Sequence, residues 1–268
     1  MKKCACNTIV VFLAVSFLAA GVFSCRSREQ ALYEQATAAL DEGLSGAAVE
    51  YFTAFLIKYP ESPLIPEVLF QRGTIYHLYQ SRYLEAIEDF RELLRRFPEH
   101  PSAFTVRRSI AELLETKVRD CRKAIVEYQK LIDDFETVVD DDLFQFHIGS
   151  CFFELLNFEQ AKLELYHLIN HYPASILVDD AYYKIAGILH TQGALEDAKS
   201  AYLLYLSRYP EGELAMDAMF NLAATLEEME RLEEALDLYN RIFPDYENKE
   251  AITWRIEKVR KRMEERGR

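Results

Sequence analysis

The sequence is poor in the residues that interrupt regular structure and in those that crosslink it. Of its 268 residues, 9 are glycine, 8 are proline and 5 are cysteine, while 50% are hydrophobic. This composition excludes an intrinsically disordered chain. Only Cys121 and Cys151 lie beyond residue 25, and two thiols cannot form a disulfide framework. We therefore expect a fold held by apolar packing, with both thiols reduced and a disulfide between them as the alternative.

Basic residues are scarce as well. The chain has 31 lysines and arginines against 44 aspartates and glutamates, and its net charge is −13. Nucleic-acid binding depends on clustered basic side chains that displace counterions from phosphates. We therefore expect no nucleic-acid partner.

Patterns typical of catalysis and metal binding are missing. There is no glycine-rich phosphate loop. His167 and His171 are four residues apart, as in a helical zinc site, but no glutamate follows His167. Asp140 to Asp142 form an acidic run without the alternating ligands and the glycine of a calcium loop, so we interpret them as residues at a helix N-terminus. We expect no enzymatic activity, no metal and no cofactor.

The first residues have the features of an export signal. Lys2 and Lys3 precede an apolar stretch from residue 9 to residue 23, which is shorter than a membrane span of about 20 residues. Residues 22–25, Val-Phe-Ser-Cys, resemble the bacterial lipobox, whose cysteine is acylated and becomes the mature N-terminus. We predict a signal peptide at 1–24, lipidation of Cys25 and a short lipidated linker at 25–30. The alternative is an ordinary signal peptide that leaves Cys25 as a thiol.

A repeat of 37 or 38 residues runs through the rest of the chain. Its clearest mark is a recurring alanine, at Ala48, Ala86, Ala124, Ala161, Ala198 and Ala235. An aromatic residue stands eleven positions after each alanine, and four of these aromatics directly precede Pro60, Pro98, Pro173 and Pro210. A small residue stands twelve or thirteen positions before each alanine, at Ala36, Gly73, Ala111, Gly149, Ala186 and Ala223. Such a period predicts a solenoid of repeated units.

Each repeat is predicted to be a pair of packed helices. The small residue and the alanine would lie where the two helices cross, because small side chains allow a close approach. Proline would end the second helix, since it has no amide hydrogen and clashes with the preceding turn. In the third and sixth repeats, Glu136 and Glu247 stand where proline is expected. We predict an all-α, right-handed solenoid with six repeats at about 31–62, 66–100, 103–138, 141–175, 178–212 and 215–248.

Residues 249–268 are predicted to form a basic capping helix. Ile252, Ile256, Val259 and Met263 recur at helical spacing and would cover the apolar seam of the last repeat. The segment holds eight basic and four acidic side chains, in contrast to the acidic remainder of the chain. This charge has two interpretations, a solvated capping face or a docking surface for an acidic partner.

The small residue, alanine, aromatic and proline of each unit resemble the tetratricopeptide repeat. The fifth repeat places Ala186, Ala198, Tyr202 and Pro210 at the offsets of that family. The resemblance implies that the fifth position of each first helix lines a concave groove. The residues at this position are Tyr33, Phe70, Arg108, Phe146, Tyr183 and Phe220. They are candidate anchors for a bound polypeptide, and the alternative is that they only fill space between helices.

A lipid signal joined to such repeats resembles the BamD family, the tetratricopeptide lipoproteins of the outer-membrane β-barrel assembly machinery. The similarity is greatest from Ala31 to Pro101, and the six predicted hairpins exceed the five typical of that family. The resemblance implies a scaffold anchored in the outer membrane and facing the periplasm. Its expected partners are envelope proteins, including the assembly machinery and unfolded outer-membrane proteins. Residues 177–248 also resemble the Tol-Pal accessory protein of cell division, which provides the alternative function.

Overall fold

The computed structural model describes residues 28–135 and 140–266. All regular secondary structure within these ranges is helical, as the sequence predicts. None of the helices there is both long and apolar enough to cross a membrane. The predicted signal peptide, Cys25 and Glu136 lie outside the described residues. The chain divides into two compact units, Met1–Arg119 (unit 1) and Asp120–Arg268 (unit 2).

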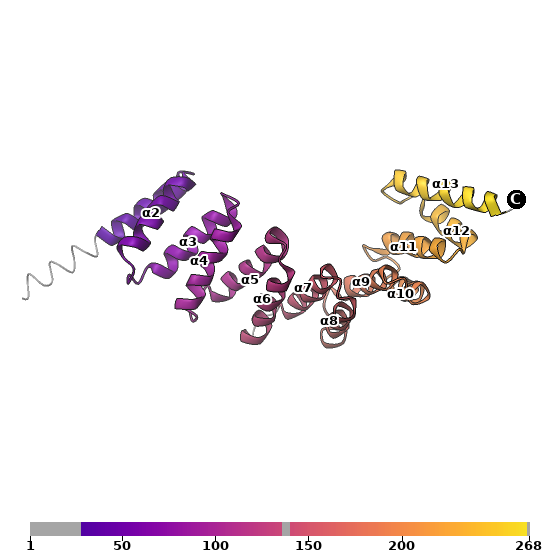
Figure 1. The fold of residues 1–268 in the computed structure, drawn as a ribbon, viewed down its shortest axis with the longest axis horizontal. Coiled ribbons are helices and arrows are strands. Elements are labelled where there is room, and N and C mark those ends of the chain that lie inside the picture. The colour runs from indigo at the N-terminus through magenta and orange to yellow at the C-terminus, as the bar shows by residue number, and fades with distance from the viewer. Residues whose placement is uncertain (1–27, 136–139, 267–268) are drawn as a thin grey trace, which may run out of the picture. The chain divides into compact units, whose positions relative to one another are not determined.

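Unit 1 is a succession of packed helices. They are the segment 28–41, α2 (Ser45–Lys58), α3 (Ile65–Leu78), α4 (Tyr83–Arg96), α5 (Ala103–Leu113) and the π-helix η1 (Leu114–Val118). From α2 to α5, each helix packs against the next along the chain (Figure 1). The segment 28–41 contacts α2 through Tyr33, whose ring meets those of Phe52 and Phe55 edge-on.

Unit 2 continues the same arrangement. Its helices are α6 (Cys121–Asp134), α7 (Asp141–Glu154), α8 (Phe158–His171), α9 (Val178–Thr191), α10 (Leu195–Arg208), α11 (Ala215–Glu228), α12 (Leu232–Ile242) and α13 (Lys249–Arg266). Each helix packs against the next, and α9 also contacts α11. Cys121 and Cys151 are both buried in this unit as thiols. Apolar packing therefore holds the fold, as the cysteine content indicates.

The recurring alanines and the small residues before them are buried, as predicted. All six alanines, from Ala48 to Ala235, have no exposed surface. A Cβ atom at Gly73 would lie 2.6 Å from the Phe90 ring, and one at Gly149 would lie 3.1 Å from Leu165. Both contacts join the first helix of a pair to its second helix. These crossings therefore have no room for a larger side chain.

A left-handed turn residue recurs in every repeat. The fifth residue before each alanine has a positive φ, between 54° and 77°, and stands between the two helices. These residues are Gly43, Ser81, Arg119, Leu156, Gly193 and Glu230. Only two are glycine, the residue that adopts this conformation without steric cost. Residue type alone therefore does not identify the position.

Proline ends the second helix in four repeats, as predicted. Helices α2, α4, α8 and α10 each end two residues before Pro60, Pro98, Pro173 and Pro210, respectively. The sixth repeat departs from the expected spacing, because α12 ends at Ile242, ahead of Pro244 and well before Glu247. Pro244 has no amide hydrogen with which to continue the helix. The shorter helix leaves Tyr246 in the following segment, where its ring stacks on Phe220.

Replacing Ala161 with leucine tests the helix crossing. Ala161→Leu should lower the free energy of unfolding by about 1–3 kcal/mol, because α7 and α8 must move apart to admit the larger side chain. Ala38→Leu, at an exposed position of the first helix, adds the same atoms without this cost and serves as the control. Thermal unfolding followed by circular dichroism compares the two. An unchanged melting temperature for Ala161→Leu would show that the crossing tolerates bulk.

Candidate binding groove

The six candidate groove residues are all half-buried. Four of the rings touch the second helix of their own repeat, in the pairs Tyr33 with Phe52, Phe70 with Phe90, Tyr183 with Tyr202, and Phe220 with Tyr239. Arg108 forms a 2.8 Å ion pair with Glu112, one turn further along α5. The rings therefore contribute to packing and still present part of their surface to solvent.

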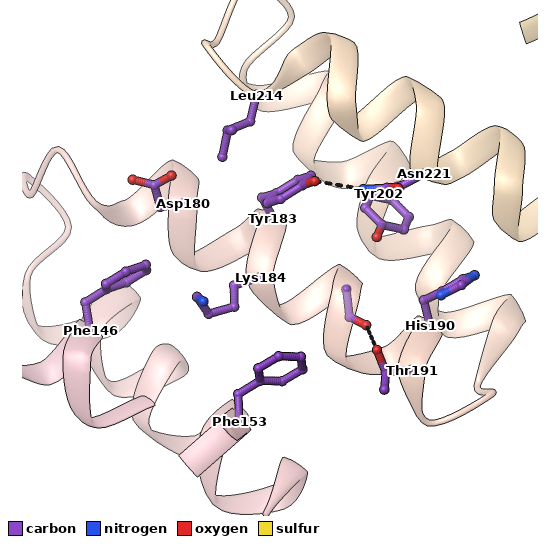
Figure 2. Close-up of a pocket in the computed structure, with 11 residues that line it drawn as sticks. Phe146, Phe153, Asp180, Tyr183, Lys184, His190, Thr191, Tyr202, Leu214 and Asn221 are labelled. Atoms are coloured by element: carbon purple, nitrogen blue, oxygen red, sulfur yellow. Dashed lines mark hydrogen bonds between the residues drawn. The ribbon is translucent and has the colours of Figure 1, made fainter. Parts of the chain in front are cut away.

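Phe146 and Tyr183 line one hollow in unit 2, which we call the α9 hollow. It lies among α7, α9 and α11 and has a volume of about 470 Å³ (Figure 2). α9 contributes the largest share of its lining. The residues around it are Phe146, Phe153, Asp180, Tyr183, Lys184, Gly187, His190, Thr191, Tyr202, Leu214 and Asn221.

Tyr183 is held in place at the α9 hollow by contacts on both sides. Its hydroxyl oxygen accepts a 2.7 Å hydrogen bond from the side-chain amide of Asn221 on α11. Its ring meets Tyr202 and Tyr205 edge-on, with centroids 6.2 Å and 6.0 Å away. Burial raises the pKa of Tyr183, and the charge of Asp217 adds to the effect. The phenol therefore stays neutral, and the hydrogen bond joins two successive first helices.

Lys184 lies between two aromatic rings in the α9 hollow (Figure 2). Its ammonium nitrogen is 5.4 Å from the ring centroid of Phe146 and 5.7 Å from that of Phe153. An ammonium group is attracted to the faces of aromatic rings, so this contact orders all three side chains. Two phenylalanines of α7 and a lysine of α9 thereby form one wall of the hollow.

Two further polar groups of the hollow, on His190 and Thr191, lie close to other groups of the chain. The Nε2 atom of His190 is 3.3 Å from a carboxylate oxygen of Glu228. The hydroxyl of Thr191 donates to the carbonyl oxygen of Gly187 at 2.9 Å. In the part of the chain that the structure describes, no group of three His, Cys, Asp or Glu residues is arranged to hold a metal ion. The arrangement is suited to contact an apolar or aromatic group by shape and burial.

Phe220, a further predicted groove residue, lies outside the α9 hollow. Its ring stacks on Tyr246 with centroids 4.9 Å apart and meets Tyr239 edge-on. Phe220 also lines a separate hollow with Trp254 and Arg255, so its ring both packs within the chain and faces open space. Sequence reasoning missed Phe153 and Lys184 because it considered one position per helix. Phe153 stands seven residues after Phe146 on the same helix face, and this spacing could have identified it.

Four basic side chains of α13 are directed at the last turn of α11 and the segment that follows it. Two carboxylates, Glu227 and Glu230, form salt bridges with four basic residues of α13, namely Arg255, Lys258, Arg262 and Arg266. Glu227 is 1% exposed, and its bonds to Arg255, Lys258 and Arg262 measure 3.1, 2.7 and 3.0 Å. Ile252, Ile256 and Val259 are buried beside them. Of the two interpretations of this helix, the structure favours the capping one.

The charge of Glu227 is stabilised despite its burial. Burial by itself raises the pKa of this carboxyl, but the hydrogen bond from Lys258 and the charges of Arg255 and Lys258 outweigh it, so the pKa lies below its usual range. A carboxyl whose pKa is lower in the folded state stabilises that state above its unfolded pKa. The stabilisation is lost as the pH falls through the folded pKa.

Replacing Glu227 with glutamine tests this anchoring. Near neutral pH, Glu227→Gln should lower the free energy of unfolding by about 2 kcal/mol, because charged hydrogen bonds to three basic groups are lost. The difference in unfolding free energy between Glu227→Gln and wild type should become smaller below about pH 4, where carboxyls become protonated. Glu234→Gln, which removes an exposed pair with Arg231, is the control and should change stability little. If this difference in unfolding free energy stays constant from pH 7 to pH 3, the ionised Glu227 carboxylate is not what stabilises the packing of α13.

Comparison with known proteins agrees with this architecture. A tetratricopeptide-repeat model matches residues 144–175, 180–212 and 217–246, and the outer membrane lipoprotein family YfiO matches residues 26–141. Residues 144–246 thus contain three matches to the tetratricopeptide repeat, and the predicted all-α solenoid of tetratricopeptide type is confirmed. Over residues 26–141 it resembles the YfiO, or BamD-type, lipoproteins, which confirms the resemblance found in the sequence. No curated protein matches the chain.

Solved structures share the fold at low sequence identity. PilW, a widely conserved type IV pilus biogenesis factor, is 17% identical, with a TM-score of 0.53 over 84% of this chain and 98% of PilW. A tetratricopeptide repeat protein from Parabacteroides merdae is 16% identical, with a TM-score of 0.52 over 86% of this chain and 98% of the other. YrrB, described as a TPR protein with an unusual peptide-binding site, is 16% identical, with a TM-score of 0.50 over 78% of this chain and 99% of YrrB. These similarities establish the fold alone.

Proposed function

We propose that this tetratricopeptide scaffold is a lipid-anchored protein of the bacterial cell envelope that takes part in the assembly of outer-membrane β-barrel proteins. Cys25 would carry the lipid at the outer membrane, and the repeats would face the periplasm. The match of residues 26–141 to an outer membrane lipoprotein family supports this proposal, because it begins directly after Cys25. In this role the protein holds other proteins and performs no chemistry.

The α9 hollow carries the binding part of the proposal. It is open to solvent among three first helices, and its aromatic residues Phe146, Phe153 and Tyr183 are held by contacts within the chain. A site whose side chains are already ordered loses little conformational entropy when it binds a partner. Its volume of about 470 Å³ suits a large side chain of a polypeptide.

The lipid anchor is tested at Cys25. Cys25→Ser should abolish incorporation of labelled palmitate and release the protein from the membrane fraction, because several acyl chains each add about 0.8 kcal/mol per buried methylene. Membrane fractionation after alkaline washing provides the measurement, and Cys121→Ser is the matched control. If both variants and the wild type fractionate alike and none takes up palmitate, the anchor is wrongly assigned.

The binding hollow is tested by removing two of its rings. Phe146→Ala combined with Tyr183→Ala should weaken capture of envelope partners on the order of thirtyfold, which corresponds to about 2 kcal/mol for loss of a central aromatic anchor. Tyr166→Ala, which removes an exposed ring of α8 outside the hollow, is the control. Pull-down yield is measured beside circular-dichroism melting. A variant that melts like wild type and retains its partners would show that the working surface lies elsewhere.

The identity of the captured partner separates the proposed function from its alternative. Residues 177–248 resemble the Tol-Pal accessory protein, so a role in cell division is the second candidate. Affinity purification from detergent-solubilised envelopes should recover a polypeptide-transport barrel protein if the assembly function holds. Recovery of Tol or Pal components without a barrel protein would favour the division function.

A further inference from the structure

A second hollow adjoins the α9 hollow and differs from it in charge. It is formed by the segment before α11, the first turn of α11 and the segment between α12 and α13, and its volume is about 420 Å³. Leu214 lines both hollows, so they meet at this residue. Four carboxylates line the second one, which we call the acidic hollow: Glu213, Asp217, Asp245 and Glu247.

Many carboxylates in the described part of this chain form salt bridges with lysine or arginine, but those of the acidic hollow do not. Glu92, Glu159, Glu196 and Glu234 each pair with a lysine or arginine three residues away. Within residues 28–135 and 140–266, by contrast, no basic side chain forms a salt bridge with the four carboxylates of the acidic hollow. Their negative charge is therefore available to a group from outside the chain.

The helix dipole accounts for only part of this cluster. Asp217 lies in the first turn of α11, where a negative charge is favourable. Glu213 stands two residues before α11 and Glu247 two residues before α13, while Asp245 lies further from either helix start, in the segment after α12. The hydroxyl of Tyr246 donates to Asp217 at 3.1 Å, and burial together with Asp217 raises the pKa of Tyr246 to about 12. This phenol therefore remains a donor that fixes the Asp217 carboxylate at the hollow.

The negative charge extends to the edge of the α9 hollow. Burial raises the pKa of Asp180, and the charges of Asp179 and Glu213 add to the rise, while Lys184 opposes it. Asp180 lines the α9 hollow, and Glu213 lines the acidic one. The carboxylates of both hollows thus act on one another across their junction at Leu214.

From these observations we infer that the two hollows bind one extended peptide segment of a partner, with an apolar or aromatic side chain in the α9 hollow and a lysine or arginine side chain in the acidic hollow. The inference rests on the proposed function and specifies the chemistry of its ligand. Aromatic walls select the first side chain by burial, and the four carboxylates select the second by charge complementarity. An isolated cation would use only the acidic hollow and leave the aromatic walls without a role.

Synthetic peptides test the inference on the full chain purified in detergent. The probes are fluorescein-labelled glycine-serine nonapeptides that carry phenylalanine and, two, three or four residues later, arginine. Matched peptides replace the arginine with glutamate or the phenylalanine with serine. By fluorescence anisotropy, the best Phe/Arg peptide should bind about tenfold more tightly than either matched peptide, and high salt should reduce the difference from the glutamate peptide.

Charge-neutralising variants locate the site of this selectivity. The triple variant Asp217→Asn, Asp245→Asn and Glu247→Gln should abolish the preference for arginine over glutamate while keeping most of the binding due to phenylalanine. The control variant Glu233→Gln, Glu234→Gln and Asp237→Asn removes the same charge from α12 and should keep the preference. Circular-dichroism melting verifies that both variants are folded.

The outcomes distinguish this inference from the proposed function. Equal affinity of wild type for the arginine and glutamate peptides, or an unchanged preference in the Asp217 triple variant, would overturn the charge assignment and leave the scaffold function standing. Failure of every peptide to bind would overturn the peptide inference, while partner capture by the wild type in the envelope pull-down would still support the scaffold. If the wild type also captures no partner in the envelope pull-down, both the peptide inference and the scaffold function are wrong.

Discussion

The close approach of the two helices in each pair is the constraint on which the rest of the structure depends. At a crossing the first helix presents only glycine or alanine, and a Cβ atom at Gly73 would already overlap the Phe90 ring. The crossing fixes the separation of the paired helices and so the direction in which the next pair begins. In unit 2 this succession brings α7, α9 and α11 to one hollow, which Phe146, Tyr183 and Asn221 line.

Much of this fold could be predicted from the sequence, because the repeated alanine and proline each restrict the local structure in one way. A buried alanine repeated at 37 or 38 residues and a proline after the second helix indicate where helices touch and where they end. The turns could not be predicted in the same way, since Ser81 and Leu156 adopt a left-handed φ that the sequence usually marks with glycine. At the α9 hollow, the positions of Phe146 and Tyr183 follow from the repeat, while the place of Lys184 depends on the rings of Phe146 and Phe153 and could not be read from the repeat.

Among the residues that the structure describes, some charged side chains form salt bridges within the chain, while others face solvent without such a partner. Most of the positive charge of α13 is directed at Glu227 and Glu230, so the helix for which the sequence left a docking surface as the alternative is bound to its own chain. The acidic hollow has the opposite character, because its carboxylates form no such pairs within the described ranges. The net charge of a segment does not tell whether its charged side chains are paired within the chain. Pairing depends on which opposite charges the fold brings close together.

Helix α11 belongs to the groove and to the capping interface at the same time. Asp217 and Asn221 line the hollows, and Glu227, further along the same helix, holds α13. An uncapped end of a solenoid exposes its apolar seam and frays, which would loosen the helix that carries both hollows. A wall that is already ordered binds with a smaller loss of conformational entropy. In the proposed binding mode, the salt bridges of Glu227 would contribute to affinity without touching the bound segment, because they hold α11, which carries Asp217 and Asn221.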